Sequence, residues 1–190
     1  EKPQNRNWNA LMHLGVMEYA NGNIEEALKL FNQSNDIKEN AWCCRNIAMI
    51  YRNEYKDYFK AYEYMKKAFS INKSCRGIVV DTAVTYLLAE KYTEWLEAYE
   101  CLGDLKQDGR LKLYCAKALM KLNKYREAAK YLNKDLVMPD IKEGDTAISD
   151  EWFELYGNFI MQDNPKIDKD SLQAEIEKKY PLGKLDFRTH

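Results

Sequence analysis

Cysteine and histidine side chains are the usual carriers of metal-binding and nucleophilic chemistry, and this chain of 190 residues contains five cysteines and two histidines. Only Cys43 and Cys44 are close together, and adjacent cysteines lack the spacing of a zinc-binding or redox CxxC motif. His13 and His190 stand near opposite ends of the chain. We therefore expect no metal site, no cofactor, and reduced, mostly buried thiols in a cytoplasmic protein. The other cysteines are Cys75, Cys101 and Cys115.

Acidic side chains occur in three close pairs, and paired carboxylates can act as a general acid and a general base. Each pair stands at an expected helix start or in a loop, where acids commonly stabilise the helix N-terminus or favour solvation. The sequence contains no GxSxG, HExxH or glycine-rich phosphate-binding motif. We therefore predict no catalytic residue and no enzyme activity for this chain. The pairs are Glu25 with Glu26, Glu143 with Asp145, and Asp150 with Glu151.

The composition indicates which elements would position any functional side chain. The chain has only 8 glycines and 4 prolines, which favours long helices over many short strands joined by tight turns. Its net charge is -1, so a general attraction to nucleic acid or to an anionic membrane is not expected. No apolar run approaches the roughly 20 residues that span a bilayer.

A regular spacing of small residues predicts how these helices pack. Gly15, Ala48, Ala83 and Ala116 follow one another at intervals of 33, 35 and 33 residues. In a pair of antiparallel helices, a small residue on the first helix lets the second approach closely, and bulky neighbours fill the remaining space. One pair cannot bury its apolar face alone. We therefore expect four pairs within residues 1–134, stacked as an all-α solenoid.

At these positions the sequence resembles the tetratricopeptide repeat family, over about residues 8–134. The first repeat carries Gly15 on its first helix and Ala27 followed by Phe31 on its second. The pattern departs from the family where Trp95 replaces the small residue of the third repeat's second helix, so we expect local distortion there. The resemblance implies that the solenoid is a right-handed superhelix of antiparallel helix pairs. It also implies a non-catalytic protein–protein interaction scaffold that binds a peptide or domain on its concave face.

Short polar residues mark where the helices are expected to begin. Asn23 and Glu26 have the spacing of a capping box. Asp57 and Asp108 each directly precede an expected helix, and the pair 149–150 (Ser-Asp) precedes another in the C-terminal part.

In the family it resembles, the first helix of each pair lines the concave face, and the register places nine candidate peptide contacts there. Five of the nine are cations and most of the others are apolar, so we predict a peptide with acidic and apolar residues. Some family members clamp a carboxylate with a Lys-Asn-Asn-Lys-Arg set, of which only Asn46 is matched here, so chaperone-tail binding is not expected. The nine candidates are Asn9, Met12, Trp42, Arg45, Met49, Arg52, Arg110, Lys117 and Lys121.

Residues 135–190 are expected to close the solenoid as part of the same domain. Proline, glycine and acids interrupt the periodic pattern at 135–148, which predicts a linker loop. Capping helices follow, with Gly157 at the small-residue place of a fifth first helix and Asp168 or Asp170 at the start of the last helix. The tail after that helix is expected to lie along the surface.

Two strings in this region are similar to the C-terminal end of a large bacterial family known mainly as a domain of unknown function (number 5107). They are PDIKEGDTAISDEWFELY at 139–156 and KLDFRTH at 184–190. Members of that family carry a β-rich, sugar-enzyme-like N-terminal region followed by tetratricopeptide repeats. The resemblance implies that this chain is the C-terminal repeat region of a longer protein.

Two classes of function therefore stay open. The first is a scaffold that binds a peptide or domain. The second is an accessory region that docks onto a β-rich, carbohydrate-enzyme-like N-terminal domain of the same bacterial protein. Pentatricopeptide-type RNA binding is disfavoured, because that family has a period near 35 and a basic surface. No nucleic-acid partner and no membrane partner are expected.

Overall fold

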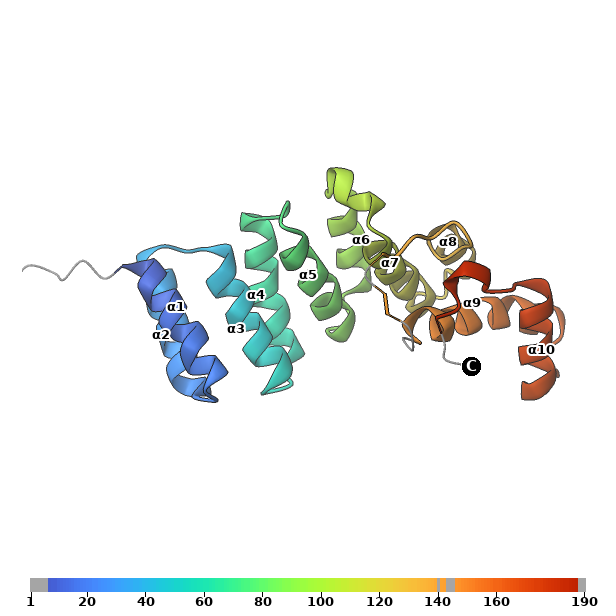
Figure 1. Cartoon of the computed structure of the whole chain (residues 1–190), viewed down its shortest axis with the longest axis horizontal. Coiled ribbons are helices and arrows are strands. Elements are labelled where there is room, and N and C mark those ends of the chain that lie inside the picture. The colour runs from blue at the N-terminus through green and yellow to red at the C-terminus, as the bar shows by residue number, and fades with distance from the viewer. Residues whose placement is uncertain (1–6, 140, 143–145, 188–190) are drawn as a thin grey trace, which may run out of the picture. The chain divides into compact units, whose positions relative to one another are not determined.

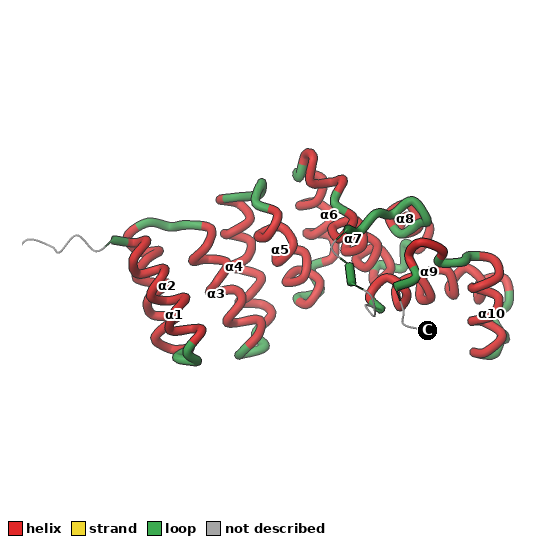
Figure 2. Tube along the Cα trace, in the orientation of Figure 1, coloured by secondary structure: helices red, strands yellow, loops and turns green. Residues whose placement is uncertain are grey.

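The computed structural model describes residues 7–139, 141–142 and 146–187, which consist of helices and loops without strands (Figure 1; Figure 2). Two short 3-10 helices, η1 (Gly103–Gln107) and η2 (Gly183–Leu185), accompany ten α-helices in these ranges. The predicted all-α class is confirmed. The α-helices are α1 (Trp8–Ala20), α2 (Ile24–Ile37), α3 (Ala41–Asn53), α4 (Tyr58–Ile71), α5 (Arg76–Leu88), α6 (Tyr92–Glu100), α7 (Gly109–Lys121), α8 (Tyr125–Tyr131), α9 (Ala147–Asp163) and α10 (Lys169–Lys179).

Consecutive helices pack in pairs, and we call the first member of each pair an A helix and the second a B helix. α1 packs with α2, α3 with α4, α7 with α8, and α9 with α10. Each B helix also packs against the next A helix, as α2 does on α3, α4 on α5, and α8 on α9. Neighbouring A helices touch as well, α3 with α5 and α7 with α9. In this arrangement, α3, α5 and α9 each pack one side against the helix pair that precedes them.

The contacts of the chain divide it into two compact units, which we call unit 1 (Glu1–Lys91) and unit 2 (Tyr92–His190). Unit 1 contains α1 to α5, and unit 2 contains α6 to α10. The division falls within the predicted third pair, between α5 and α6. The predicted single domain, with its cap beginning after residue 134, stays a prediction.

Small residues hold the helices of unit 1 close together, as their spacing predicts. Gly15 is buried, and a Cβ atom at this position would lie 2.7 Å from Cε1 of Phe31. Ala48 and Ala83, at the equivalent places on α3 and α5, have no exposed surface. The close approach of α1 and α2 therefore depends on the missing side chain of Gly15.

Aspartate caps begin helices where the sequence predicts them. Asp57 Oδ1 accepts from the Lys60 backbone N–H at 2.9 Å, and Asp108 Oδ1 accepts from that of Arg110 at 2.9 Å. Asp168 Oδ1 likewise accepts from the Ser171 backbone N–H at 3.0 Å and starts α10. Such caps act within one turn of chain, so they can be predicted locally.

One predicted cap and one predicted helix start are wrong. α2 begins directly after Asn23, as predicted, but the Asn23 side chain makes no cap with the helix, and its Nδ2 donates to Glu18 Oε2 at 2.6 Å. The capping box with Glu26 is therefore not formed. α9 begins at Ala147, ahead of the predicted Ser149, because Ser149 is buried in the first turn and donates to the Thr146 carbonyl at 2.9 Å.

The third B helix is shortened where the distortion was expected. α6 has 9 residues against 14 in α2 and in α4, and η1 follows it after a short break. Trp95 is completely buried in α6 and packs edge-on against Tyr99. The fourth B helix, α8, is shorter still at 7 residues although it carries the small Ala128, so the indole does not explain the shortening of α6.

The C-terminal part of unit 2 is built into its core. Trp152 Nε1 donates to the Tyr180 carbonyl at 2.8 Å, and Leu182 and Leu185 are buried in one cluster with Trp152. The prediction of a surface tail is therefore wrong for residues up to 187, because these leucines fill the core beside α9. Gly157 faces Ile176 of α10, as predicted for a fifth A helix. The predicted acids Glu143 and Asp145, His190 and the rest of 188–190 lie outside the described residues.

Candidate functional site

A strip of four predicted contact residues runs along the exposed side of α3. Trp42, Arg45, Met49 and Arg52 follow one another at intervals of three, four and three residues, which places them on one helix face. Trp42 is 45% exposed, whereas the tryptophans Trp95 and Trp152 are buried. An apolar ring left in water at the end of a charged strip is a candidate anchor for a partner. We call these four residues the α3 strip.

The opposite side of α3 fixes the orientation of this strip. Cys43, Ile47 and Ile50 are buried in one cluster with Ala27 and Phe31 of α2. Because α2 holds that side in the core, the α3 strip faces away from it. Asn40 fixes the start of the helix, because its Oδ1 accepts from the Cys43 backbone N–H at 2.9 Å.

Both arginines of the α3 strip are held by Asp81 of α5. Arg45 reaches Asp81 Oδ2 with Nε at 2.7 Å and Nη2 at 2.6 Å. Arg52 Nη2 lies 3.7 Å from Asp81 Oδ1, and its Nη1 donates to Thr85 Oγ1 at 3.2 Å. The three charged side chains are largely buried, with 28%, 11% and 16% of Arg45, Arg52 and Asp81 exposed. Together these two cations and one anion carry one net positive charge.

The remaining predicted contacts of unit 1 differ in their exposure. Asn9 is exposed on α1. Met12 is partly buried and packs against the cluster formed by α2 and α3, and Met49 packs against the cluster that contains Ala48 and Ile78. These two methionines present only part of their surface to a ligand.

The predicted contacts of unit 2 lie on α7, and two of them face acids of α9. Lys117 Nζ lies 2.7 Å from Glu151 Oε1, and Lys121 Nζ lies 3.8 Å from Glu154 Oε1. Arg110 is partly buried at the start of α7. The structure therefore places six of the nine candidates in unit 1 and three in unit 2.

Sequence reasoning missed the acidic partners of these cations. Asp81 stands 36 residues after Arg45, and Glu151 stands 34 residues after Lys117. Each interval is about one repeat, so the two charges lie on neighbouring A helices. A search for opposite charges separated by about one repeat would have found both pairs.

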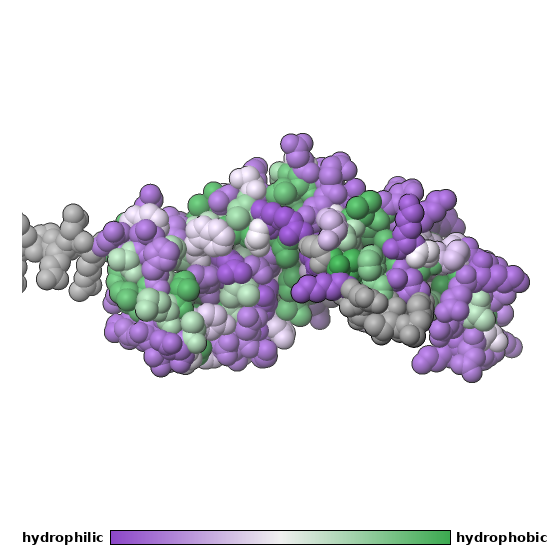
Figure 3. Space-filling model, viewed as in Figure 1, coloured by the Kyte–Doolittle hydropathy of each residue, from purple (hydrophilic) through white to green (hydrophobic). Residues whose placement is uncertain are grey.

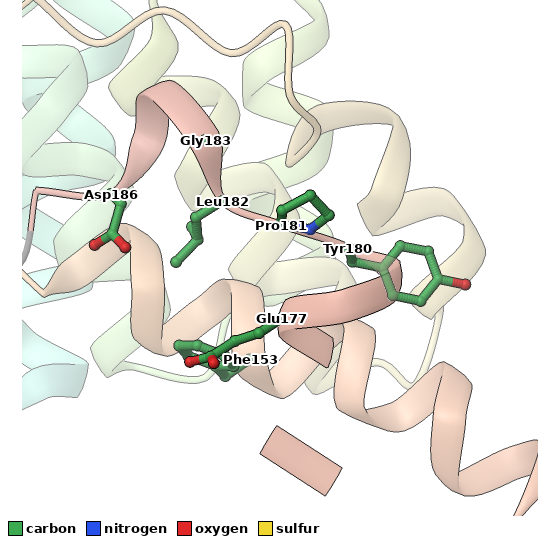
Figure 4. Close-up of a pocket in the computed structure, with 7 residues that line it drawn as sticks. All are labelled: Phe153, Glu177, Tyr180, Pro181, Leu182, Gly183 and Asp186. Atoms are coloured by element: carbon green, nitrogen blue, oxygen red, sulfur yellow. The ribbon is translucent and has the colours of Figure 1, made fainter. Parts of the chain in front are cut away.

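A pocket of about 450 Å³ opens near the C-terminal end of unit 2. Phe153 of α9 and Glu177 of α10 lie on one side of it, and Leu182 and Asp186 of the following segment lie on the other (Figure 4). Its walls combine apolar side chains with two carboxylates. Tyr180, Pro181 and Gly183 complete the lining.

The buried cysteine thiols are poorly suited to act as nucleophiles. Burial raises the pKa of the Cys115 thiol well above its usual range, and the Trp95 indole opposes this only in part. Burial also raises the pKa of the Cys44 thiol. Both thiols are therefore held in the neutral form, which is the poorer nucleophile. Within the described ranges, no cluster of three or more histidine, cysteine, aspartate or glutamate side chains could hold a metal ion.

No helix of the described ranges is long and apolar enough to cross a lipid bilayer. No known protein-family model matches the sequence, and no curated protein matches it.

Solved structures match the fold. MamA of AMB-1 superposes with a TM-score of 0.57 and 16% identity, over 66% of this chain and 69% of that chain. TTC0263, a thermophilic TPR protein of Thermus thermophilus, superposes with a TM-score of 0.55 and 16% identity, over 90% of this chain and 97% of that chain. These similarities confirm the predicted tetratricopeptide-type fold.

Proposed function

We propose that this chain is a non-catalytic scaffold that binds a polypeptide segment on the A-helix face of unit 1. The observation that carries the proposal is the α3 strip, in which an exposed tryptophan stands beside two arginines fixed by Asp81. Tryptophan and arginine dominate the binding energy of many protein interfaces. Solenoids of stacked helix pairs present extended surfaces suited to such binding.

The chemistry of the α3 strip indicates what the segment carries. Trp42 offers a flat apolar surface to an aliphatic or aromatic side chain. Arg45 and Arg52 are already oriented by Asp81, so they lose little side-chain entropy when a ligand arrives. The net positive charge of the three side chains suits one carboxylate of the ligand. We therefore infer a segment with an apolar residue and an acidic residue close together.

Selection from a displayed library of random peptides on the immobilised chain tests this proposal. We expect the selected peptides to combine apolar and acidic residues and to lose at least about tenfold in affinity for Trp42→Ala, which removes a central aromatic contact. Phe59→Ala is the matched control, because Phe59 is an aromatic residue, 65% exposed, on the B helix α4. Selected peptides that bind Trp42→Ala as tightly as the unchanged chain would refute the proposed site.

A second candidate is the accessory role, in which this chain docks onto a β-rich N-terminal domain of a longer bacterial protein. One observation favours it. Trp152 and Phe153, from one of the two strings that suggest that family, stand beside Leu185 and Asp186 from the other, in the core and the pocket of unit 2. The pocket carboxylates would suit a basic side chain on a docking loop.

Co-expression of this chain with such a β-rich domain tests the second candidate. Glu177→Lys is expected to weaken the complex, because it reverses a charge at the pocket rim. Ala174→Lys adds the same side chain at an exposed position of α10 that does not line the pocket. Equal binding by both variants, or no complex at all, would count against this candidate.

A further inference from the structure

Gly77 of α5 leaves open space at the end of the α3 strip where Trp42 lies. Gly77 is exposed in the first turn of α5, and a Cβ atom added there would meet no atom of another described element within 4 Å. The interval of 35 residues between Ala48 and Ala83 also leads from Trp42 to Gly77. An exposed indole and an exposed residue without a side chain therefore hold equivalent places on neighbouring A helices.

Contacts between α3 and α5 place Trp42 and Gly77 at the same level of the two helices. Ala41 and Ile78 are buried in one cluster, and they directly adjoin the two exposed residues in the sequence. About one turn further along α3, Arg45 forms its ion pair with α5 at 2.6 Å. The open space at Gly77 therefore has the Trp42 indole beside it and a fixed guanidinium one turn away.

We propose that Gly77 is a specificity-determining residue, whose missing side chain admits one large apolar side chain of the bound segment against the Trp42 indole. This inference rests on the proposed function, because it concerns the same α3 strip. A large side chain packed on the indole removes apolar surface of both partners from water. A side chain at position 77 would occupy the same space, and exclusion of this kind is one way in which binding sites select their partners.

The exposures of the two arginines determine where the acidic residue of the segment lies. Arg45 is 28% exposed and Arg52 is 11% exposed, so Arg45 is the more accessible to a ligand. Arg45 follows Trp42 by three residues, which is about 4.5 Å along the helix axis. In an extended segment, side chains on one face recur at every second residue, about 6.6 Å apart. We therefore expect the large apolar residue and the acidic residue to be two positions apart.

The charge of the site favours this segment over an entirely apolar one. Arg45, Arg52 and Asp81 carry one net positive charge, which a carboxylate next to the apolar residue would neutralise. Figure 3 shows hydrophobic and hydrophilic residues interspersed over the visible face of unit 1. Such a mixed surface suits a segment that carries both kinds of residue.

Gly77→Leu tests the inference with the peptides selected on the immobilised chain. We expect the variant to bind them at least about tenfold more weakly, because the added side chain fills the space beside Trp42. It is expected to remain folded, since leucine favours a helix more than glycine does and meets open space here. Ser70→Leu is the matched control, because it adds the same side chain at an exposed position of the B helix α4. Fluorescence anisotropy of labelled peptides measures the affinities, and circular dichroism establishes that both variants are folded.

A second library selection, on immobilised Gly77→Leu, gives a readout that a loss of folding would not produce. Peptides selected on the unchanged chain are expected to carry tryptophan, phenylalanine or leucine two positions from aspartate or glutamate. Peptides selected on the variant are expected to carry a smaller apolar residue, such as alanine or valine, in that place.

The outcomes separate this inference from the proposed function. Full affinity of Gly77→Leu, together with weakened binding by Trp42→Ala, would overturn the role of Gly77 and leave the proposed function standing. An unchanged size of the apolar residue in the second selection, or the absence of a preferred spacing, would also overturn it. A library that yields no binder, or full affinity of Trp42→Ala, would refute the proposed function and this inference with it.

Discussion

At the scale of single residues, the size of one side chain decides whether two helices can meet. Gly15 has Phe31 against its Cα, and an added Cβ would lie 2.7 Å from that ring. Gly77 is also helical, but a carbon added there meets no atom within 4 Å. The two glycines therefore offer a matched pair of substitutions with opposite expected signs.

Gly15→Ala is expected to lower the free energy of unfolding by about 1–3 kcal/mol, because it overpacks the contact with Phe31. Gly77→Ala is expected to leave stability unchanged or raise it by up to about 1 kcal/mol, because alanine favours the helix. Urea denaturation followed by circular dichroism measures both. A neutral Gly15→Ala would show that α1 and α2 do not rely on this close approach.

Buried ionisable side chains predict a loss of stability at alkaline pH. Burial raises the pKa of both Cys115 and Tyr99 above their ordinary values of 9.0 and 10.0. The folded chain therefore keeps these protons while the unfolded chain releases them. The stabilisation is complete below the ordinary values and is lost as pH rises above them, by about 1.4 kcal/mol per group for each pH unit until the folded pKa is reached.

Chemical labelling gives a second readout of the same burial. Iodoacetamide is expected to modify Cys101, which is exposed, long before Cys115 in the folded chain. Mass spectrometry of the labelled peptides measures the two rates. Equal rates under native conditions would contradict the buried, neutral state of Cys115.

At the scale of elements, neighbouring A helices are joined by ion pairs that cross from one repeat to the next. Arg45 of α3 meets Asp81 of α5, and Lys117 of α7 meets Glu151 of α9. The two contacts are buried to the same extent, and the one at Asp81 differs in that a single carboxylate meets two arginines, Arg45 and Arg52. Removing the Asp81 carboxylate would leave the positive charges of Arg45 and Arg52 near each other without the acid that lies between them.

Asp81→Asn is expected to lower the free energy of unfolding by about 1–3 kcal/mol, less than for a fully buried pair because Arg45 is partly in water. Glu26→Gln, which breaks an exposed pair with Lys29, is expected to change it by less than about 0.5 kcal/mol. Urea denaturation of both variants provides the comparison. Equal, small effects would mean that Asp81 does not join α3 to α5.

The same elements show what sequence can and cannot predict. Helix pairs and the starts at Asp57 and Asp108 follow from local spacing, so they could be predicted. The absence of a side-chain cap at Asn23 could not be predicted, because the Asn23 amide is hydrogen-bonded to Glu18 of the preceding helix. The α3 strip was predicted from the register alone. The role of Asp81 was missed, because it acts through a contact between repeats.

At the scale of the whole molecule, the chain contains two compact units, and the proposed functions use different parts of them. The α3 strip belongs to unit 1. The pocket beside Asp186 belongs to unit 2.

Methionine methyl signals test the central claim most directly, because the chain carries 7 methionines spread over both units. In a chain labelled with 13C at these methyl groups, titration with a selected peptide is predicted to change the chemical shifts of the Met12 and Met49 methyl signals, which report on the A helices of unit 1. The methyl signals of Met65, which is buried on the B helix α4, and of Met161 in unit 2 are predicted to keep their chemical shifts. Shifts confined to Met161, or a bound peptide that leaves Met49 unchanged, would contradict binding on the A-helix face.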